Sequence, residues 1–185
     1  MIIAAAGRRI DAADAAQPRF PLRNVGIVRA RVRAMLQKLG ASRLVSSAAC
    51  GADLIALAEA GSLGLRRKVI LPFDREYFRK TSVADRPGDW GGLYDQIVEQ
   101  VQKAGELVIV PEALDERAYS AANRRILDEA ISLGQQCHEP VTAMSIWDGV
   151  SRGDDDLTAA FAVEARNRGL PVVEVRTDRP DTVKE

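Results

Sequence analysis

Short apolar runs alternate along the chain with segments whose apolar residues recur every three or four positions. The apolar runs predict strands at 2–6, 44–46, 68–71, 107–110, 141–146 and 171–175. The helical spacing predicts helices between them, at 24–40, from 51 onward, from 93 onward, at 120–133 and at 154–168. Such alternation is typical of a parallel sheet covered on both faces. The pattern therefore predicts an α/β fold, a doubly wound, mostly parallel, Rossmann-like sheet of about six strands.

One segment, 73–92, breaks this alternation. It carries the aromatic residues Tyr77, Phe78 and Trp90 among many charged ones. It is either a long surface connection or a lid over a site, because long loops in compact domains are often functional. No repeat or linker divides the chain, so we expect one domain over 1–185, with a loose polar tail at 177–185.

Composition narrows the class of protein. The chain has 46% hydrophobic and 28% charged residues, a globular balance, and 26 basic residues match 26 acidic ones. A zero net charge disfavours nucleic acid as a partner, since duplex binders carry a basic excess. No apolar run reaches the roughly 18 residues of a membrane span, and no basic segment precedes the first apolar run, so we expect a cytoplasmic protein. Two cysteines and one histidine predict neither a disulfide framework nor a metal site.

Ligands of open parallel sheets bind beyond the carboxyl ends of the strands, where the strand order reverses. Gly7, Arg8 and Arg9 follow the first predicted strand, and Trp147 and Asp148 follow the fifth. Either arginine could clamp a phosphate or a carboxylate, or lie on a solvated rim. The indole of Trp147 could stack on a base.

The loop 46–53 consists of small residues and leads into a helix. Ser47 and Gly51 would let backbone N–H groups approach an anion, which the helix dipole favours. The alternative is that small residues merely let strand and helix pack closely. Asp53 could accept a ribose hydroxyl or cap its helix.

An acidic turn follows the fifth strand and includes Asp148 and the run 154–156. Its carboxylates either cap the next helix or face the ligand, where they would disfavour triphosphates without a divalent cation. The chain contains neither G-x-G-x-x-G after a strand nor G-x-x-x-x-G-K-[ST]. A conventional dinucleotide dehydrogenase and a P-loop nucleotidase are therefore disfavoured, and no cofactor is expected.

Six short motifs in a fixed order carry a family resemblance. They lie at 7–11, 19–21, 51–53, 71–78, 81–83 and 147–149. In this order they resemble the Rossmann-like domains of the SLOG superfamily, which includes the DNA-processing protein A fold and the LOG phosphoribohydrolases. The loop 46–53 is similar to the S-G-x-A-x-G-I-D loop of the former. The resemblance implies a nucleotide or its phosphate against this loop.

The departures from the superfamily concern catalysis. The P-G-G-x-G-T-x-x-E element of the LOG enzymes is absent, so we expect no cleavage of nucleoside monophosphates at their rates. Nucleoside deoxyribosyltransferases, a similar fold, place a catalytic glutamate three residues after a threonine. After Thr158 that position is Phe161, and the nearest acid is Glu164.

We therefore predict that the chain binds or senses a nucleotide-like small molecule. The residues predicted to contact it are Gly7, Arg8, Arg9, Ser47, Gly51, Asp53, Trp147 and Asp148. One alternative is a glycosidic-bond hydrolase acting on a nucleoside or nucleoside monophosphate, with Asp53, Asp148 or Glu164 as acid or base. Another is a single-stranded DNA binding module. Whether the chain forms a homo-oligomer is left open.

Overall fold

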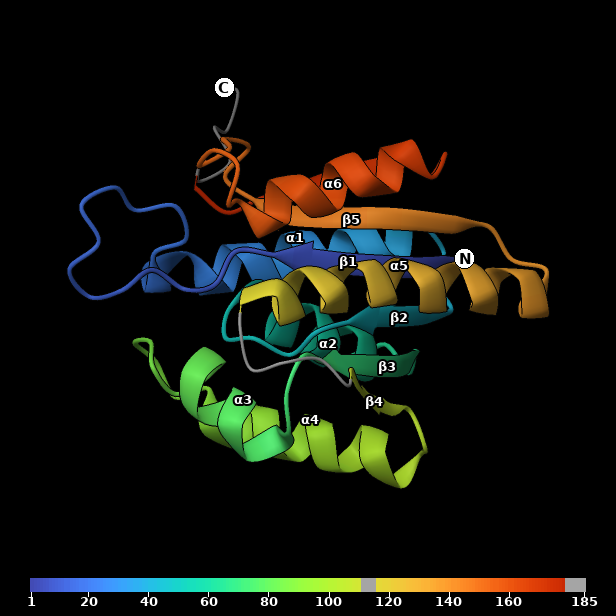
Figure 1. Ribbon diagram of the computed structural model, residues 1–185, viewed down its shortest axis with the longest axis horizontal. Coiled ribbons are helices and arrows are strands. Elements are labelled where there is room, and N and C mark those ends of the chain that lie inside the picture. The colour runs from blue at the N-terminus through green and yellow to red at the C-terminus, as the bar shows by residue number, and fades with distance from the viewer. Residues whose placement is uncertain (111–115, 179–185) are drawn as a thin grey trace.

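The computed structural model describes residues 1–110 and 116–178. Six strands form one sheet in the order β4-β3-β2-β1-β5-β6, and every neighbouring pair is parallel (Figure 1). The strands are β1 (Ile2–Gly7), β2 (Arg43–Ser46), β3 (Arg66–Leu71), β4 (Leu107–Ile109), β5 (Val141–Trp147) and β6 (Val172–Arg176). This sheet confirms the predicted Rossmann-like fold class.

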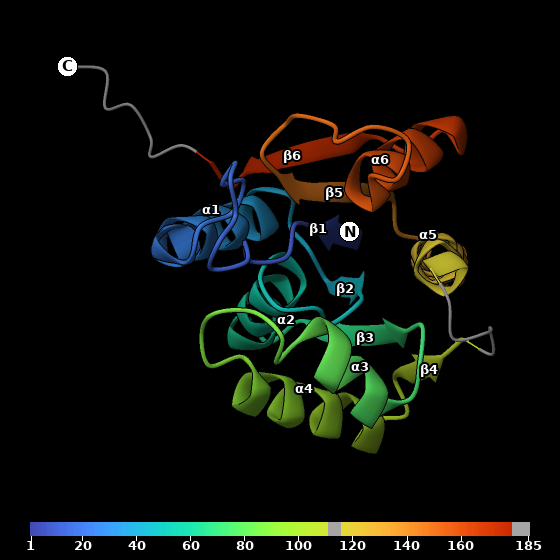
Figure 2. The same cartoon turned by 60° about the vertical axis from the view of Figure 1, so that its left-hand side comes forward.

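Helices cover both faces of the sheet. They are α1 (Val25–Lys38), α2 (Ala52–Ser62), α3 (Arg75–Ser82), α4 (Gly91–Lys103), α5 (Glu116–Cys137) and α6 (Leu157–Asn167), with a 3₁₀ turn, η1 (Leu22–Asn24), before α1. Figure 2 shows α1 and α2 on one side of the strands and α5 and α6 on the other. Central strand β1 is apolar at every position because it faces both layers: Ile3 and Ala5 pack in one core, and Ile2 and Ala4 in the other.

The strand order reverses between β1 and β5. The chain begins with β1, builds the sheet outward through β2, β3 and β4, and returns along α5 to place β5 on the other side of β1. In an open α/β sheet, this reversal leaves a crevice beyond the carboxyl ends of the two strands. The residues that follow β1 and β5 therefore lie at the position where ligands of such folds bind.

The helix predicted at 120–133 is followed by Gly134, a residue typical of a helix C-cap, but α5 continues past this glycine to Cys137. Gly134 is not a cap. A Cβ at this position would collide with the side chain of Val141 and lie 2.9 Å from the carbonyl oxygen of Glu139. The glycine lets the helix pass close to the start of β5, a requirement that the sequence pattern does not distinguish from a helix end.

The segment 73–92 is not a single long loop. Asp74 caps α3, because its Oδ1 accepts hydrogen bonds from the N–H groups of Glu76 and Tyr77 at 3.1 and 3.0 Å. Phe78 and Trp90 are buried in the core that contains Ile3. Most of the aromatic surface that suggested a lid is therefore used for packing, and Tyr77 remains exposed.

Thr177 was expected to begin a loose tail, but it is fully buried. Its N–H donates to the carbonyl of Trp147 at 3.0 Å, and its hydroxyl donates to the carbonyl of Arg19 at 2.7 Å. The ordered chain thus extends past β6, and the rest of the predicted tail, 179–185, lies outside the described residues. Within the described ranges, no helix is both long and apolar enough to cross a membrane.

Candidate ligand site at the carboxyl ends of the strands

Arg8 lies at the reversal point and is held by protein groups on every side. Its Nε donates to Asp148 Oδ1 at 2.8 Å, and its two terminal nitrogens donate to Asp156 at 2.6 and 2.7 Å. One terminal nitrogen also donates to the carbonyl of Val150 at 2.7 Å. Arg19 donates to the second oxygen of Asp148 at 2.7 Å. We call Arg8, Arg19, Asp148 and Asp156 the Arg8 cluster.

The Arg8 cluster balances two positive charges with two negative ones in a buried position. The side chains of Arg8, Asp148 and Asp156 are 3%, 7% and 0% exposed. Because these groups already bind one another, Arg8 and Asp148 have little hydrogen-bonding capacity left for a ligand. They join the segment after β1 to the turn after β5 and so form the floor of the site.

The contacts of Asp156 show which of the two predicted roles, helix capping or ligand contact, this residue of the acidic turn has. Its Oδ1 accepts from the N–H groups of Thr158 and Ala159 at 3.0 and 3.1 Å, so it caps α6. Burial opposes its ionisation, but hydrogen bonds from Arg8 and from the N–H groups of Arg152 and Ala159 outweigh this and lower its pKa to about 2. The capping interpretation is confirmed for Asp156, whereas Asp154 and Asp155 are exposed.

The loop before α2 is covered by the chain that follows β1. The N–H of Ala52 donates to the carbonyl of Arg8 at 3.0 Å. Gly51 has φ +100°, and a Cβ there would lie 2.8 Å from Ile10 N and 2.9 Å from Arg8 O. These contacts favour close packing over anion binding as the role of Gly51, and a larger residue there would strain the fold. Ser47 is partly exposed beside this covered turn.

Gly7 also serves packing between β1 and α2. A Cβ on Gly7 would collide with the Ala52 side chain and with the carbonyl of Ile146. The glycine therefore lets the start of α2 approach the end of β1. That approach brings Asp53, in the first turn of α2, to the carboxyl ends of β1 and β2.

Asp53 is buried with one oxygen unused. It is 7% exposed, its Oδ2 accepts from the N–H of Ala49 at 3.3 Å, and its Oδ1 has no hydrogen-bond partner. Burial raises the pKa of Asp53 to about 7, although N–H groups of Ala49 and Gly7 and the charge of Arg9 act in the opposite direction. Asp53 can therefore accept or donate a proton near neutral pH.

Arg9 links the site to the segment 73–92. Its guanidinium forms an ion pair with Asp85, and its Nε is buried without a partner. The N–H of Cys50 donates to the carbonyl of Ser82, also in that segment, at 3.0 Å. The segment thus forms one wall of the site, held by a main-chain hydrogen bond and an ion pair.

Trp147, the last residue of β5, presents its indole at the same edge. Its Nε1 is buried without a hydrogen-bond partner, and the Arg8 guanidinium carbon lies 5.6 Å from the centroid of its ring. The side chain is partly exposed. It therefore combines a free N–H donor with an aromatic surface.

Unpartnered polar atoms gather at the ends of the central strands. Of the six buried side-chain atoms without a partner in the described residues, five lie there: Arg9 Nε, Ser46 Oγ, Asp53 Oδ1, Ser145 Oγ and Trp147 Nε1. Buried polar groups are almost always hydrogen-bonded, so this concentration requires an explanation. Ser46 and Ser145 are not among the residues predicted from the sequence, although a serine in a mostly apolar buried strand was a usable signal.

Glu164, the third predicted acid, lies elsewhere. It is in the second turn of α6, roughly 10 Å along the helix from the end that faces the site, and its Oε1 accepts from Arg168 Nε at 2.8 Å. Of the three candidate acids, only Asp53 combines burial at the strand ends with a free oxygen. The described residues contain no group of three or more His, Cys, Asp or Glu side chains suited to a metal ion.

The chain was compared with protein-family models, curated proteins and solved structures. No protein-family model matches the chain, and no curated protein matches it. DNA processing protein A (DprA) from Streptococcus pneumoniae is 14% identical with a TM-score of 0.42, over 94% of this chain and 58% of that one. The molybdenum cofactor binding protein from the phototrophic bacterium Rippkaea orientalis is 11% identical with a TM-score of 0.37, over 93% of this chain and 88% of that one.

The chain spans less than two thirds of the DprA structure. At these identities the likeness concerns the fold alone, so it assigns no ligand or activity.

Proposed function

We propose that the protein binds a nucleoside or a nucleoside monophosphate at the carboxyl ends of β5, β1 and β2. The observation that supports this most is the set of unpartnered buried atoms on Arg9, Asp53 and Trp147. A hydrogen bond to a ligand would offset the free-energy cost of burying each of these atoms without a partner. Together they offer a cationic N–H donor, a carboxyl group, and an indole N–H on an aromatic ring.

The spacing of the strands matches a ligand of this size. Strands β5, β1 and β2 are neighbours in the sheet, and neighbouring strands lie about 4.8 Å apart, so the three ends span about 10 Å. A nucleoside bridging them would place its base on Trp147 and a ribose hydroxyl on Asp53. Arg9 would meet a phosphate.

The charges around the site favour a ligand with few negative charges. The Arg8 cluster is neutral as a whole, and Arg9 is paired with Asp85. Arg152 Nε also lies 3.7 Å from Asp156, and Arg86 Nε lies 3.5 Å from Asp85, but the exposed Asp154 and Asp155 offset these two further charges. A triphosphate would also approach Asp53 and Asp85, which disfavours it. We therefore favour adenosine or AMP over ATP when no divalent cation is present.

Calorimetric titration tests this proposal. AMP should bind the wild type, and Trp147→Leu should weaken binding about tenfold or more, because stacking on an aromatic side chain contributes about 1–3 kcal/mol. Trp90→Phe is the matched control, since Trp90 is buried and its Nε1 donates to the carbonyl of Pro87 at 2.9 Å. Its affinity should equal that of the wild type.

Three results would contradict the proposal. These are the absence of binding by adenosine and AMP, tighter binding of ATP than of AMP in EDTA, and equal affinities of the wild type and Trp147→Leu. A short single-stranded oligonucleotide belongs in the same series. If it bound more tightly than AMP, the single-stranded DNA alternative would replace the small-molecule proposal.

A second candidate function, hydrolysis of a glycosidic bond, is favoured by one observation. The raised pKa of Asp53, about 7, leaves part of its population protonated at neutral pH. A protonated carboxyl at this place could donate its proton to a departing base while water attacks the sugar carbon. No second carboxylate with a free oxygen accompanies Asp53 at the described strand ends.

Chromatography of AMP incubated with the protein separates the two functions. We expect no measurable adenine, because no partner acid stands beside Asp53 and the catalytic element of the LOG enzymes is absent. Adenine release that falls as pH rises through about 7, and that disappears in Asp53→Asn, would instead establish hydrolysis with Asp53 as the acid.

A further inference from the structure

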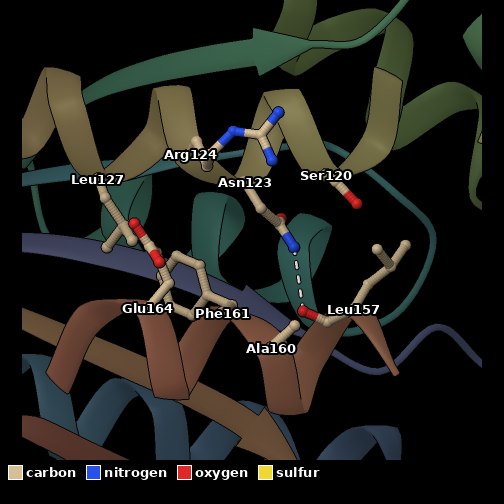
Figure 3. Close-up of a pocket in the computed structure, with 8 residues that line it drawn as sticks. All are labelled: Ser120, Asn123, Arg124, Leu127, Leu157, Ala160, Phe161 and Glu164. Carbon is tan, nitrogen blue, oxygen red and sulfur yellow. Dashed lines mark hydrogen bonds between the residues drawn. The ribbon is translucent and has the colours of Figure 1, made fainter. Parts of the chain in front are cut away.

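A pocket lies between α5 and α6, on the face of the sheet that these helices cover (Figure 3). Its volume is about 160 Å³. Each helix contributes four residues at helical spacing, which places them on one face toward the other helix. The two rows thus form opposite walls.

The pocket combines an apolar floor with a polar rim. Leu127 and Phe161 are buried beneath it, whereas Arg124 is exposed. An enclosed cavity of about 150 Å³ accommodates benzene, so this pocket as a whole, which is open to solvent, has room for one small molecule. Polar groups on the same ligand would then form hydrogen bonds or ion pairs with the side chains of the rim.

The charges on the rim are separated. Arg124 has no ion-pair partner in the part of the chain that the structure describes. Asp128, one turn further along α5, pairs with Arg168 instead, and Arg168 also binds Glu164. The two carboxylates share one guanidinium, so the Glu164 end of the pocket has a negative excess and the Arg124 end a positive one.

Further hydrogen-bonding capacity lies close to Arg124. Asn123 donates its amide N–H to the carbonyl of Leu157 at 3.0 Å, which leaves its side-chain oxygen free (Figure 3). The Ser120 hydroxyl makes no hydrogen bond to the described residues. Ser120 and Arg124, one turn apart on α5, can therefore both donate to the same anionic group.

We propose that this pocket binds a small zwitterion, an α-amino acid with an apolar side chain. Its carboxylate would meet Arg124 and Ser120, and its ammonium group would meet Glu164. Its side chain would lie against Leu157 and Ala160, above the buried Leu127 and Phe161. A ligand with one charge of each sign satisfies both ends of the rim. This site is separate from the one at the strand ends, and it requires no nucleotide.

Titration with L-leucine, followed by calorimetry or ligand-observed NMR, tests the proposal. L-leucine should bind, and two analogues that each lack one charge, 4-methylpentanoate and 3-methylbutylamine, should bind about tenfold more weakly, as expected for the loss of one charged hydrogen bond. Arg124→Gln should reduce the difference between leucine and the amine. Glu164→Gln should reduce the difference between leucine and the carboxylate.

Two further variants make the test specific. Ala160 is exposed on the α6 wall, so Ala160→Phe should fill the pocket and abolish leucine binding without disturbing the core. Arg125→Gln is the matched control, since Arg125 pairs with Glu129 and does not line the pocket.

The proposal is overturned if leucine does not bind, if either analogue binds as tightly as leucine, or if Ala160→Phe still binds it. AMP affinity should be the same in the wild type and in Arg124→Gln. Measuring AMP and leucine binding separately shows which of the two proposed sites is wrong if one ligand does not bind.

Discussion

Asp53→Asn is expected to make the protein more stable than the wild type above pH 7. The pKa of Asp53 is about 7 in the folded protein, because burial disfavours the charged carboxylate, and about 3.9 in an unfolded chain. As pH rises between these values, the unfolded state loses its proton while the folded state retains it. The wild type therefore loses stability relative to the variant by about 1.4 kcal/mol per pH unit, or about 4 kcal/mol in total.

Urea denaturation of both proteins from pH 4 to pH 8 measures this difference. Near pH 4 the two should be almost equally stable, because Asp53 is protonated in the folded protein and asparagine has nearly the same shape. Asp95→Asn, at an exposed carboxylate, is the control and should show no comparable trend. A difference between Asp53→Asn and the wild type that stays constant across this range would show that Asp53 is ionised in the folded state.

Arg8→Met should destabilise the protein by about 3–5 kcal/mol, the usual effect of removing one partner from a buried ion pair. The variant keeps most of the side-chain volume. It leaves Asp156 with backbone N–H donors and the exposed Arg152 guanidinium at 3.7 Å, and Asp148 with Arg19. Denaturation at pH 7 measures the loss. Adding Asp156→Asn should recover part of it, because asparagine still caps α6 and brings no buried charge.

Arg79→Met provides the comparison for this prediction. Arg79 and Asp95 also form an ion pair, but their side chains are 42% and 50% exposed, so we expect little change in stability. If Arg8→Met had as small an effect as Arg79→Met, the Arg8 cluster would not be the element that holds the turn after β5 in place.

The fold could be predicted because each strand and helix carries its own local signal. The buried strand β1 is apolar on both faces, and α1 shows one apolar stripe at Val28, Val32 and Leu36. The predictions that were wrong concern residues whose roles depend on partners distant in the sequence. Gly134 resembled a helix cap, and the role of Thr177 depends on Trp147 and Arg19.

The sequence could predict that the candidate residues follow the central strands, but not which of their polar atoms are already bound within the described part of the chain. Both Arg8 and Arg9 follow β1, and nothing local distinguishes them. Arg8 is occupied because Asp156, far along the chain, reaches it from the start of α6. Likewise, the small residues around Gly51 were compatible with both packing and anion binding, and the approach of the Arg8–Ile10 backbone, visible only in three dimensions, favours packing.

The proposed function requires that a nucleoside-type ligand contact Trp147 at the carboxyl ends of the strands. The chain has two tryptophans, so a ¹H–¹⁵N spectrum resolves two indole N–H signals, which Trp147→Leu and Trp90→Phe assign. On titration with AMP, the Trp147 Nε1–H signal should shift progressively to saturation, since this donor has no partner among the residues that the structure describes. The Trp90 signal should stay in place, because that N–H is bound to Pro87. A Trp147 signal that does not move at saturating AMP, or that moves no more than the Trp90 signal, would contradict the account.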